Sequence, residues 1–263
     1  MCYAIDARPP LPPIAGGAAD SEDLTLTAAD GTQFAAFAAR SAAPNGAGMV
    51  VLPDVRGLFH FYEELALRFA EQGINAVAID YFGRTAGVAK RDAEFPFMEH
   101  IPRTRLATIA QDVAAAIAYL RSPAGGSCRD IFTVGFCFGG SSSWLQAAEQ
   151  PDLAGAIGFY GGPGPNMADG SPGPAARLAE FKAPILALIA GADAYIPADL
   201  NEAFRQAVEA KGGGNEAVIY PGAPHSFFDR AYDEYKDACN DAWTRILAFI
   251  ARNRTAAAAG ATA

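Results

Sequence analysis

Short apolar runs alternate with stretches of helical periodicity along most of this chain. Strands are predicted for the apolar runs, at residues 49–53, 75–80, 130–135, 154–160, 183–190 and 216–220. Helices are predicted for the periodic stretches, at residues 61–72, 106–120, 140–148, 198–210 and 232–251. Because the inner strands are apolar at every position, the pattern indicates a mostly parallel central sheet flanked by helices on both faces, an α/β fold.

The segments outside this alternation divide the chain into an arm, one domain and a tail. Residues 1–22 are rich in Pro, Ala and Gly, which predicts an extended arm over the surface. A single domain is predicted for residues 23–254, and it opens with a hairpin of strands 23–28 and 33–38 around an Asp-Gly turn. The Ala-rich residues 255–263 are predicted to form a disordered tail.

One connection is long for a compact domain. Residues 81–104 carry aromatic and charged side chains without a clear period. Connections of this length tend to be functional or mobile, so this segment is a candidate for contact with a ligand.

Composition and charge exclude several classes of function. The formal net charge is −9 over 263 residues, and the sequence contains no basic stripe. Both observations argue against a nucleic-acid partner. No apolar run is long enough for a membrane helix, and Asp6 and four prolines stand where a signal peptide needs an apolar run. We therefore expect a cytoplasmic protein, a monomer or a homodimer, that acts on a small molecule.

The four cysteines, Cys2, Cys128, Cys137 and Cys239, form neither a CxxC pair nor a cluster with histidine. We therefore expect no metal site and no disulfide framework. With three histidines in the chain, His60, His100 and His225, the candidates for a general base are few.

Cys137 is the strongest candidate for a catalytic nucleophile. It is the centre of a Gly-x-Cys-x-Gly pentapeptide, residues 135–139, between a predicted strand and a predicted helix. This is the nucleophile-elbow pattern with sulfur in place of the usual serine oxygen. The turn is tight, so the flanking glycines are required, and the helix N-terminus favours a thiolate. The alternative is a structural cysteine in a Gly-rich turn.

Two further residues stand where partners of such a nucleophile belong. Asp193 comes just after one predicted strand, and His225 just after the next. By themselves they suit a turn aspartate and a solvated loop histidine. The order nucleophile, acid, histidine, each after a separate strand, is however the order of a catalytic triad on an α/β sheet. We therefore predict a triad of Cys137, Asp193 and His225.

These segments carry a family resemblance. Residues 134–140, 191–197 and 222–227 together resemble the dienelactone hydrolase family (carboxymethylenebutenolidase-like), over about residues 25–250. The resemblance implies an α/β-hydrolase fold and a Cys-Asp-His triad that works without metal or organic cofactor. It also implies cleavage of an ester or lactone.

Further residues are assigned on this resemblance. The oxyanion hole is predicted to consist of the N–H groups of Val55 and Phe138. Asp54 stands where the family places an acidic residue that contacts the resting thiol, and its alternative is a cap of the next turn. Arg56 could supply a positive charge to the substrate, and its alternative is a solvated surface residue.

The substrate contacts differ from the family pattern. Asp229 occupies the position where family members that bind a carboxylate substrate have an arginine, so dienelactone itself is in doubt. Aromatic residues gather near the predicted strand ends, and most of them are expected in the core. Phe82 and Tyr195 are the two predicted to contact substrate.

The sequence thus predicts a carboxylic ester or lactone hydrolase that forms a thioester on Cys137. Two alternatives stay open. One is a cysteine acyltransferase, because polyhydroxyalkanoate synthases also have a Gly-x-Cys-x-Gly elbow. The other is a non-catalytic or redox-sensing relative, in which Cys137 is oxidised or merely packed.

Overall fold

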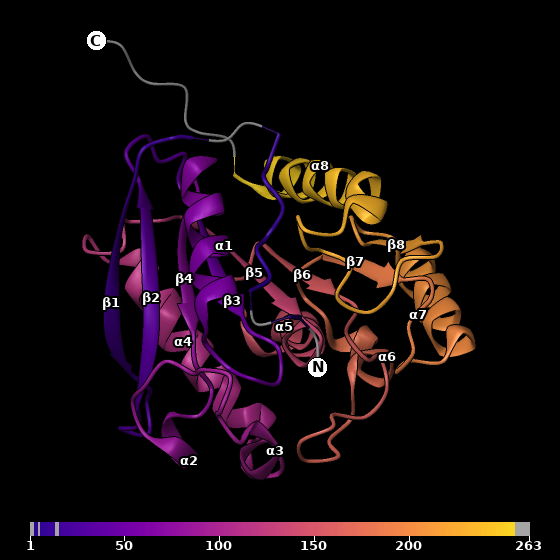
Figure 1. Ribbon diagram of the computed structural model, residues 1–263, viewed down its shortest axis with the longest axis horizontal. Helices are drawn as coiled ribbons and strands as arrows, with labels where there is room; N and C mark the ends of the chain where they lie inside the picture. Colours follow the sequence, from indigo (N-terminus) through magenta and orange to yellow (C-terminus); the bar gives the residue numbers. More distant parts are fainter. Residues whose placement is uncertain (1–2, 5, 14–15, 256–263) are drawn as a thin grey trace.

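Eight strands form one sheet in the order β1-β2-β4-β3-β5-β6-β7-β8 (Figure 1). The strands are β1 Ala19–Thr27, β2 Gln33–Ser41, β3 Ala47–Leu52, β4 Asn75–Ile79, β5 Asp130–Phe136, β6 Gly155–Phe159, β7 Ile185–Ala190 and β8 Glu216–Tyr220. The structure is a computed structural model and describes residues 3–4, 6–13 and 16–255. Cys2 and residues 256–263 of the predicted tail lie outside the described residues.

Most neighbouring strands run parallel. Only β1 with β2 and β2 with β4 pair antiparallel. The predicted hairpin pairs Thr27 with Gln33, and its turn uses Gly31 at φ +83°, a conformation that glycine adopts without strain. Strands β3 to β7 are buried along their whole length, which explains their continuous apolar sequence. The predicted α/β class is confirmed.

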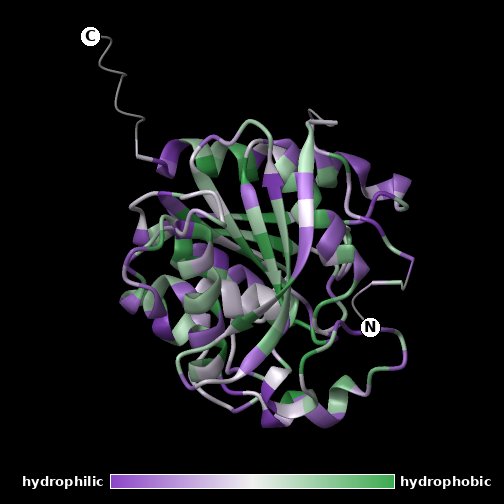
Figure 2. Ribbon diagram, turned by 90° about the vertical axis from the view of Figure 1, so that its left-hand side faces the viewer, coloured by the Kyte–Doolittle hydropathy of each residue, from purple (hydrophilic) through white to green (hydrophobic). Residues whose placement is uncertain are grey.

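Helices cover both faces of the sheet. The long ones are α1 His60–Glu71, α4 Leu106–Arg121, α5 Phe138–Glu149, α7 Ala198–Lys211 and α8 Lys236–Asn253. Apolar side chains of α1 and α8 pack into one buried cluster, and those of α4, α5 and α7 pack into a second. Figure 2 shows the hydrophobic strands between these helices. Within the described residues, none of the helices combines the length and apolar character needed to cross a membrane.

Two differences from the prediction concern the last helix and the connection 81–104. The last helix begins at Lys236 rather than at 232, after the short 3-10 helix η3 Asp233–Tyr235. The connection 81–104, expected to be irregular, contains α2 Gly83–Ala86, α3 Phe97–His100 and the 3-10 helix η1 Ile101–Arg103. Its segments α2 and α3 lie at the bottom of the molecule in Figure 1. The connection between β6 and β7 carries α6 Pro174–Arg177 and η2 Leu178–Glu180.

The N-terminal arm is docked rather than loosely exposed. The Tyr3 side chain is buried, and its ring stacks on Phe61 with centroids 4.1 Å apart. The Pro10 carbonyl accepts a hydrogen bond from the indole N–H of Trp243 at 2.9 Å. Strand β1 begins at Ala19, inside the segment predicted as arm. Part of the arm therefore belongs to the packed domain.

Candidate active site

The elbow at Cys137 has the geometry that its glycines predict. Cys137 joins β5 to α5 at φ 57° and ψ −115°. A Cβ on Gly135 would lie 1.9 Å from the Gly139 carbonyl oxygen, and one on Gly139 would lie 2.1 Å from the Pro53 carbonyl oxygen. Side chains at either position would collide with backbone, so the tight turn needs both glycines.

The Asp193 and His225 side chains meet at the neighbouring strand ends. His225 Nδ1 lies 2.7 Å from Asp193 Oδ2. The other carboxylate oxygen accepts backbone N–H bonds from Tyr195 at 2.8 Å and Ile196 at 3.2 Å. The side chains of Asp193 and His225 are 1% and 7% exposed. The carboxylate is therefore held rigidly and orients the imidazole.

Unusual backbone conformations are concentrated here. Among the described residues, the non-glycine residues with positive φ are Ser127, Cys137, Tyr160 and Ser226. Three of them surround the candidate site: Cys137, Tyr160 directly after β6, and Ser226 directly after His225. Residues held in such conformations cluster at functional sites, where the surrounding packing keeps them in place.

The predicted oxyanion donors lie at the same cavity. Phe138 is the first residue of α5, so its N–H has no intrahelical acceptor. Val55 lies in a turn closed by the bond from the Gly57 N–H to the Asp54 carbonyl at 3.1 Å. The Tyr62 hydroxyl holds the Asp54 N–H at 2.9 Å, which fixes the turn just before Val55. Both residues line the cavity that also contains Cys137 and His225.

Asp54 and Arg56 form a buried ion pair rather than substrate contacts. They are 0% and 6% exposed, and Arg56 donates to both Asp54 carboxylate oxygens, with a shortest separation of 2.7 Å. A further Arg56 nitrogen donates to the Tyr3 carbonyl at 2.9 Å, and the guanidinium lies over the Phe59 ring. Neither Asp54 nor Arg56 lines the cavity. The alternative that Arg56 is a solvated surface residue is also wrong, because its side chain is buried by its contacts with Asp54 and the Tyr3 carbonyl.

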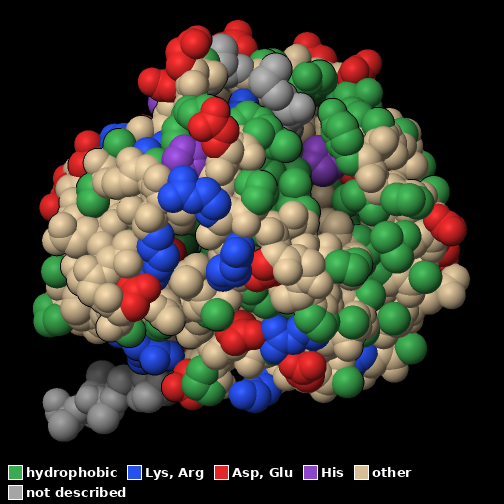
Figure 3. Space-filling view, turned by 90° about the horizontal axis from the view of Figure 1, so that it is seen from below, with side chains coloured by type: hydrophobic (Ala, Val, Ile, Leu, Met, Phe, Trp, Pro, Cys, Tyr) green, Lys and Arg blue, Asp and Glu red, His purple; other side chains and the backbone are tan. Residues whose placement is uncertain are grey.

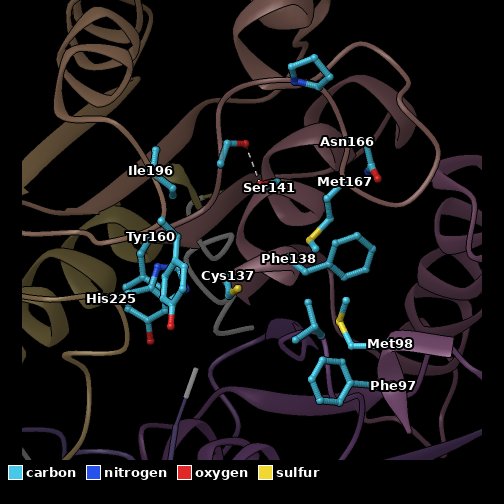
Figure 4. Close-up of a pocket in the computed structure, with 14 residues that line it drawn as sticks. Phe97, Met98, Cys137, Phe138, Ser141, Tyr160, Asn166, Met167, Ile196 and His225 are labelled. Atoms are coloured by element: carbon cyan, nitrogen blue, oxygen red, sulfur yellow. Dashed lines mark hydrogen bonds between the residues drawn. The ribbon is translucent and has the colours of Figure 1, made fainter. Parts of the chain in front are cut away.

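The cavity has a volume of about 440 Å³ and is mainly apolar (Figure 4). Its lining residues are Val55, Phe97, Met98, Cys137, Phe138, Ser141, Tyr160, Gly162, Pro165, Asn166, Met167, Tyr195, Ile196 and His225. Tyr195 lines this cavity, and its contact with substrate stays a prediction. Phe82 does not line the cavity, because it is fully buried and packs against Phe95 and Tyr81 of the same connection, 81–104.

Several residues that line the cavity were not predicted from the sequence. Met98 comes from α3, and Asn166 and Met167 come from the loop 161–173. The Ser141 hydroxyl donates to the Gly162 carbonyl at 2.8 Å and joins this loop to α5 (Figure 4). No motif marks these positions, because they reach the cavity only through the packing of two separate loops.

The arm reaches the site through Tyr160. The hydroxyl groups of Tyr3 and Tyr160 hydrogen-bond, and the Tyr160 ring lies 4.8 Å from the His225 ring, centroid to centroid. Asp229 also binds the N-terminal arm. It is 1% exposed and accepts the Arg8 N–H at 3.3 Å. Asp229, at the position where carboxylate-binding family members have an arginine, therefore does not line the cavity.

The site offers side-chain chemistry. In the part of the chain that the structure describes, no group of three or more His, Cys, Asp and Glu residues could hold a metal ion. The arrangement that is present is a thiol, an imidazole oriented by a carboxylate, and two backbone N–H groups at one apolar cavity. This set is suited to transfer of an acyl group.

Comparison with known proteins finds relatives that match most of this chain. A relative from Salmonella typhi named "Putative carboxymethylenebutenolidase" is 29% identical over 241 residues, which cover 88% of this chain and 87% of the relative. A "Probable 2-oxo-3-(5-oxofuran-2-ylidene)propanoate lactonase" from a Bradyrhizobium species is 26% identical and covers 77% of this chain and 82% of its own length.

A solved structure extends the likeness to three dimensions. The crystal structure of a "Putative Dienelactone Hydrolase" from Klebsiella pneumoniae superimposes with a TM-score of 0.77 at 27% identity, covering 89% of this chain and 99% of that one. The α/β-hydrolase fold is thereby confirmed. The model of the dienelactone hydrolase family matches residues 34–253. The chain therefore belongs to the dienelactone hydrolase family, whose members are hydrolases that act on lactones and esters.

Proposed function

We propose that this protein hydrolyses a small carboxylic ester or lactone through a covalent thioester on Cys137. One observation carries the proposal. The 2.7 Å contact between His225 and Asp193 lies at a cavity whose wall also includes Cys137 on its strained turn. A nucleophile, a base and an orienting carboxylate at one cavity are the parts that acyl transfer requires.

In the first half of the reaction, Asp193 accepts the Nδ1–H of His225, and the Nε2 atom of His225 takes the thiol proton. The Cys137 sulfur attacks the acyl carbon, and the N–H groups of Val55 and Phe138 stabilise the oxyanion. The tetrahedral intermediate collapses, the carbon–oxygen bond to the alcohol breaks, and His225 returns the proton to the leaving oxygen. The acyl group then remains on sulfur as a thioester.

In the second half, His225 takes a proton from a water molecule, which attacks the thioester carbonyl. The same two N–H groups stabilise the second oxyanion. The carbon–sulfur bond breaks, the acid leaves, and Cys137 recovers its proton. An acyltransferase would differ only here, with an alcohol in place of water. Product analysis in the presence of added glycerol or ethanol separates the two, and we expect free acid to predominate.

Selective alkylation tests the reactivity of Cys137. Burial raises the pKa of Cys128, and burial raises the pKa of Cys239 to about 12, so both thiols should react slowly. Cys137 faces the cavity beside His225. We expect iodoacetamide to modify Cys137 at least about tenfold faster than Cys128 or Cys239. Mass spectrometry of the separate peptides measures each rate.

A competing ester substrate should slow this labelling, because the acylated sulfur cannot be alkylated. Labelling of Cys137 no faster than that of Cys239 in the folded protein would rule out a catalytic thiolate. Rapid labelling without any ester turnover would instead favour the redox-sensing alternative.

Asp169 fastens the cavity loop to α4. Burial acts to raise the pKa of Asp169, but hydrogen bonds from the backbone N–H groups of Leu106 and Ser171, at 3.0 Å each, outweigh it, and the pKa lies below its ordinary 3.8. The folded state therefore favours the carboxylate. Its contribution to stability is present above about pH 3.8 and is lost as the pH falls through the lowered pKa.

The variant Asp169→Asn should loosen the loop that carries Asn166 and Met167. We expect KM to rise about two- to fivefold with kcat nearly unchanged, because the loop contacts substrate but not the reacting atoms. Asp152→Asn, at an exposed aspartate outside the cavity, is the matched control. A loss confined to kcat would contradict this role.

A further inference from the structure

The described part of the cavity wall lacks acidic residues, lysine and arginine. Most of the wall is aliphatic, aromatic or thioether surface. A substrate group in this cavity therefore exchanges water for apolar contacts, which favours an uncharged group and disfavours an ionised one.

Two arginines of the connection 81–104 form ion pairs with aspartates outside the cavity. Arg84 pairs with Asp30 and Asp112, and Arg91 pairs with the buried Asp80 at 2.8 Å. Moving either guanidinium to the substrate would leave a buried carboxylate without its partner, which is strongly unfavourable.

The two arginines that follow α3 do not supply a charge either. Arg105 donates to the carbonyl groups of Pro102 and Thr104, and Arg103 is exposed on η1. Neither lines the cavity. A carboxylate on the substrate would therefore find no cationic side chain of the described cavity wall to pair with.

The apolar surface continues outward at the cavity mouth. Met98, Met167 and Tyr195 are large hydrophobic residues that are 63%, 58% and 67% exposed, and they come from three separate segments. Figure 3 views this face, and its right half carries mainly hydrophobic and uncharged side chains, whereas Lys and Arg gather left of and below the centre. Methionine side chains are flexible and adapt to apolar ligands of varied shape.

The two sides of the cavity differ in chemistry. In Figure 4, His225 and Tyr160 lie on one side of Cys137, and Phe138, Met167, Met98 and Phe97 lie on the other. On the mechanism proposed above, His225 gives its proton to the leaving alcohol oxygen, so the alcohol part must lie on the His225 side. The acyl chain then extends toward the phenylalanine and methionine side.

We propose that this protein selects uncharged esters or lactones with an extended apolar acyl group, which lies against Phe97, Met98, Phe138 and Met167. A substrate with a carboxylate on its acyl part is rejected. This inference rests on the proposed hydrolase function and adds to it the chemical class of the substrate.

Esters that share one leaving group test the proposal. The series consists of the p-nitrophenyl esters of acetate, pentanoate, octanoate and benzoate, and of succinate with one free carboxylate. We expect kcat/KM for the octanoate to exceed that for the acetate by about tenfold or more. The pentanoate should exceed the succinate monoester, which is similar in length, by about 100-fold.

Variants locate the selectivity. Met98→Ala and Met167→Ala should each lower the octanoate-to-acetate ratio, because the chain loses its apolar wall. Met167→Arg should raise activity on the succinate monoester relative to the pentanoate, by placing a cation at the mouth. Val88→Ala removes an equally apolar residue, 46% exposed and away from the cavity, and should leave both ratios unchanged.

Failure of this proposal and failure of the proposed function look different. Equal rates on the pentanoate and the succinate monoester, with acyl–Cys137 detected by mass spectrometry, would overturn the selectivity and leave the thioester mechanism intact. Ratios that stay at the wild-type value in Met98→Ala and Met167→Ala would also overturn it. No acyl–Cys137 and no turnover with any ester would overturn both.

Discussion

Cys137→Ala is expected to lower kcat for hydrolysis of p-nitrophenyl acetate by roughly 10⁴-fold or more. Without the sulfur no thioester forms, and the remaining groups can only position water near the ester. The N–H groups of Val55 and Phe138 and the apolar cavity stay in place, so a small residual rate above buffer is expected. Steady-state kinetics of the purified variant, with urea unfolding to check the fold, measure the effect.

Two comparisons make this result specific. Cys128→Ala removes a buried thiol outside the cavity and should keep nearly full activity. Cys137→Ser keeps a hydroxyl at the elbow and should be far slower than the wild type, because His225 must then deprotonate a much weaker acid. Wild-type turnover by Cys137→Ala would disprove the role of this residue in catalysis.

Arg56→Met is expected to destabilise the protein by about 3–5 kcal/mol. The substitution leaves the carboxylate of Asp54 fully buried without its ion-pair partner. It also removes the hydrogen bond to the Tyr3 carbonyl, which holds the arm. Urea unfolding followed by tryptophan fluorescence gives the free energy of unfolding. Because Asp54 precedes Val55, activity of the folded variant should fall as well.

The double variant Asp54→Asn with Arg56→Met separates charge burial from packing. Removing both charges should recover much of the lost stability, since the main cost is the uncompensated carboxylate. Arg205→Met breaks exposed pairs with Glu202 and Glu209 and is expected to cost below about 1 kcal/mol. An Arg56→Met variant as stable as Arg205→Met would show that the buried pair contributes little.

The elbow and the triad order could be read from the sequence because local rules govern them. A tight strand-to-helix turn tolerates only glycine at positions 135 and 139, so the pentapeptide reports the conformation of Cys137 directly. Asp193 and His225 each follow an apolar run directly. Parallel strands place their carboxyl ends at one edge, so the three residues could be expected together before any coordinates were known.

The environment of these residues could not be read in the same way. Asp54 and Arg56 are two positions apart, and nothing local distinguishes a buried ion pair from a substrate contact or a solvated side chain. Phe82 was expected at the mouth, but the connection 81–104 folds into short helices and buries it. In both cases the outcome depends on which distant segments exclude water.

Periodicity, turn glycines and the order of chemical groups therefore specify the strands, the helices and the candidate catalytic residues, because those depend on neighbours within a few positions. Tertiary packing alone decides the walls of the cavity. Tyr3 meets Tyr160 across 157 positions, and Met98 and Met167 meet at one mouth from different loops. Such contacts form only when the whole chain folds, so the ion pairs and the apolar surface of the cavity exist only in the folded protein.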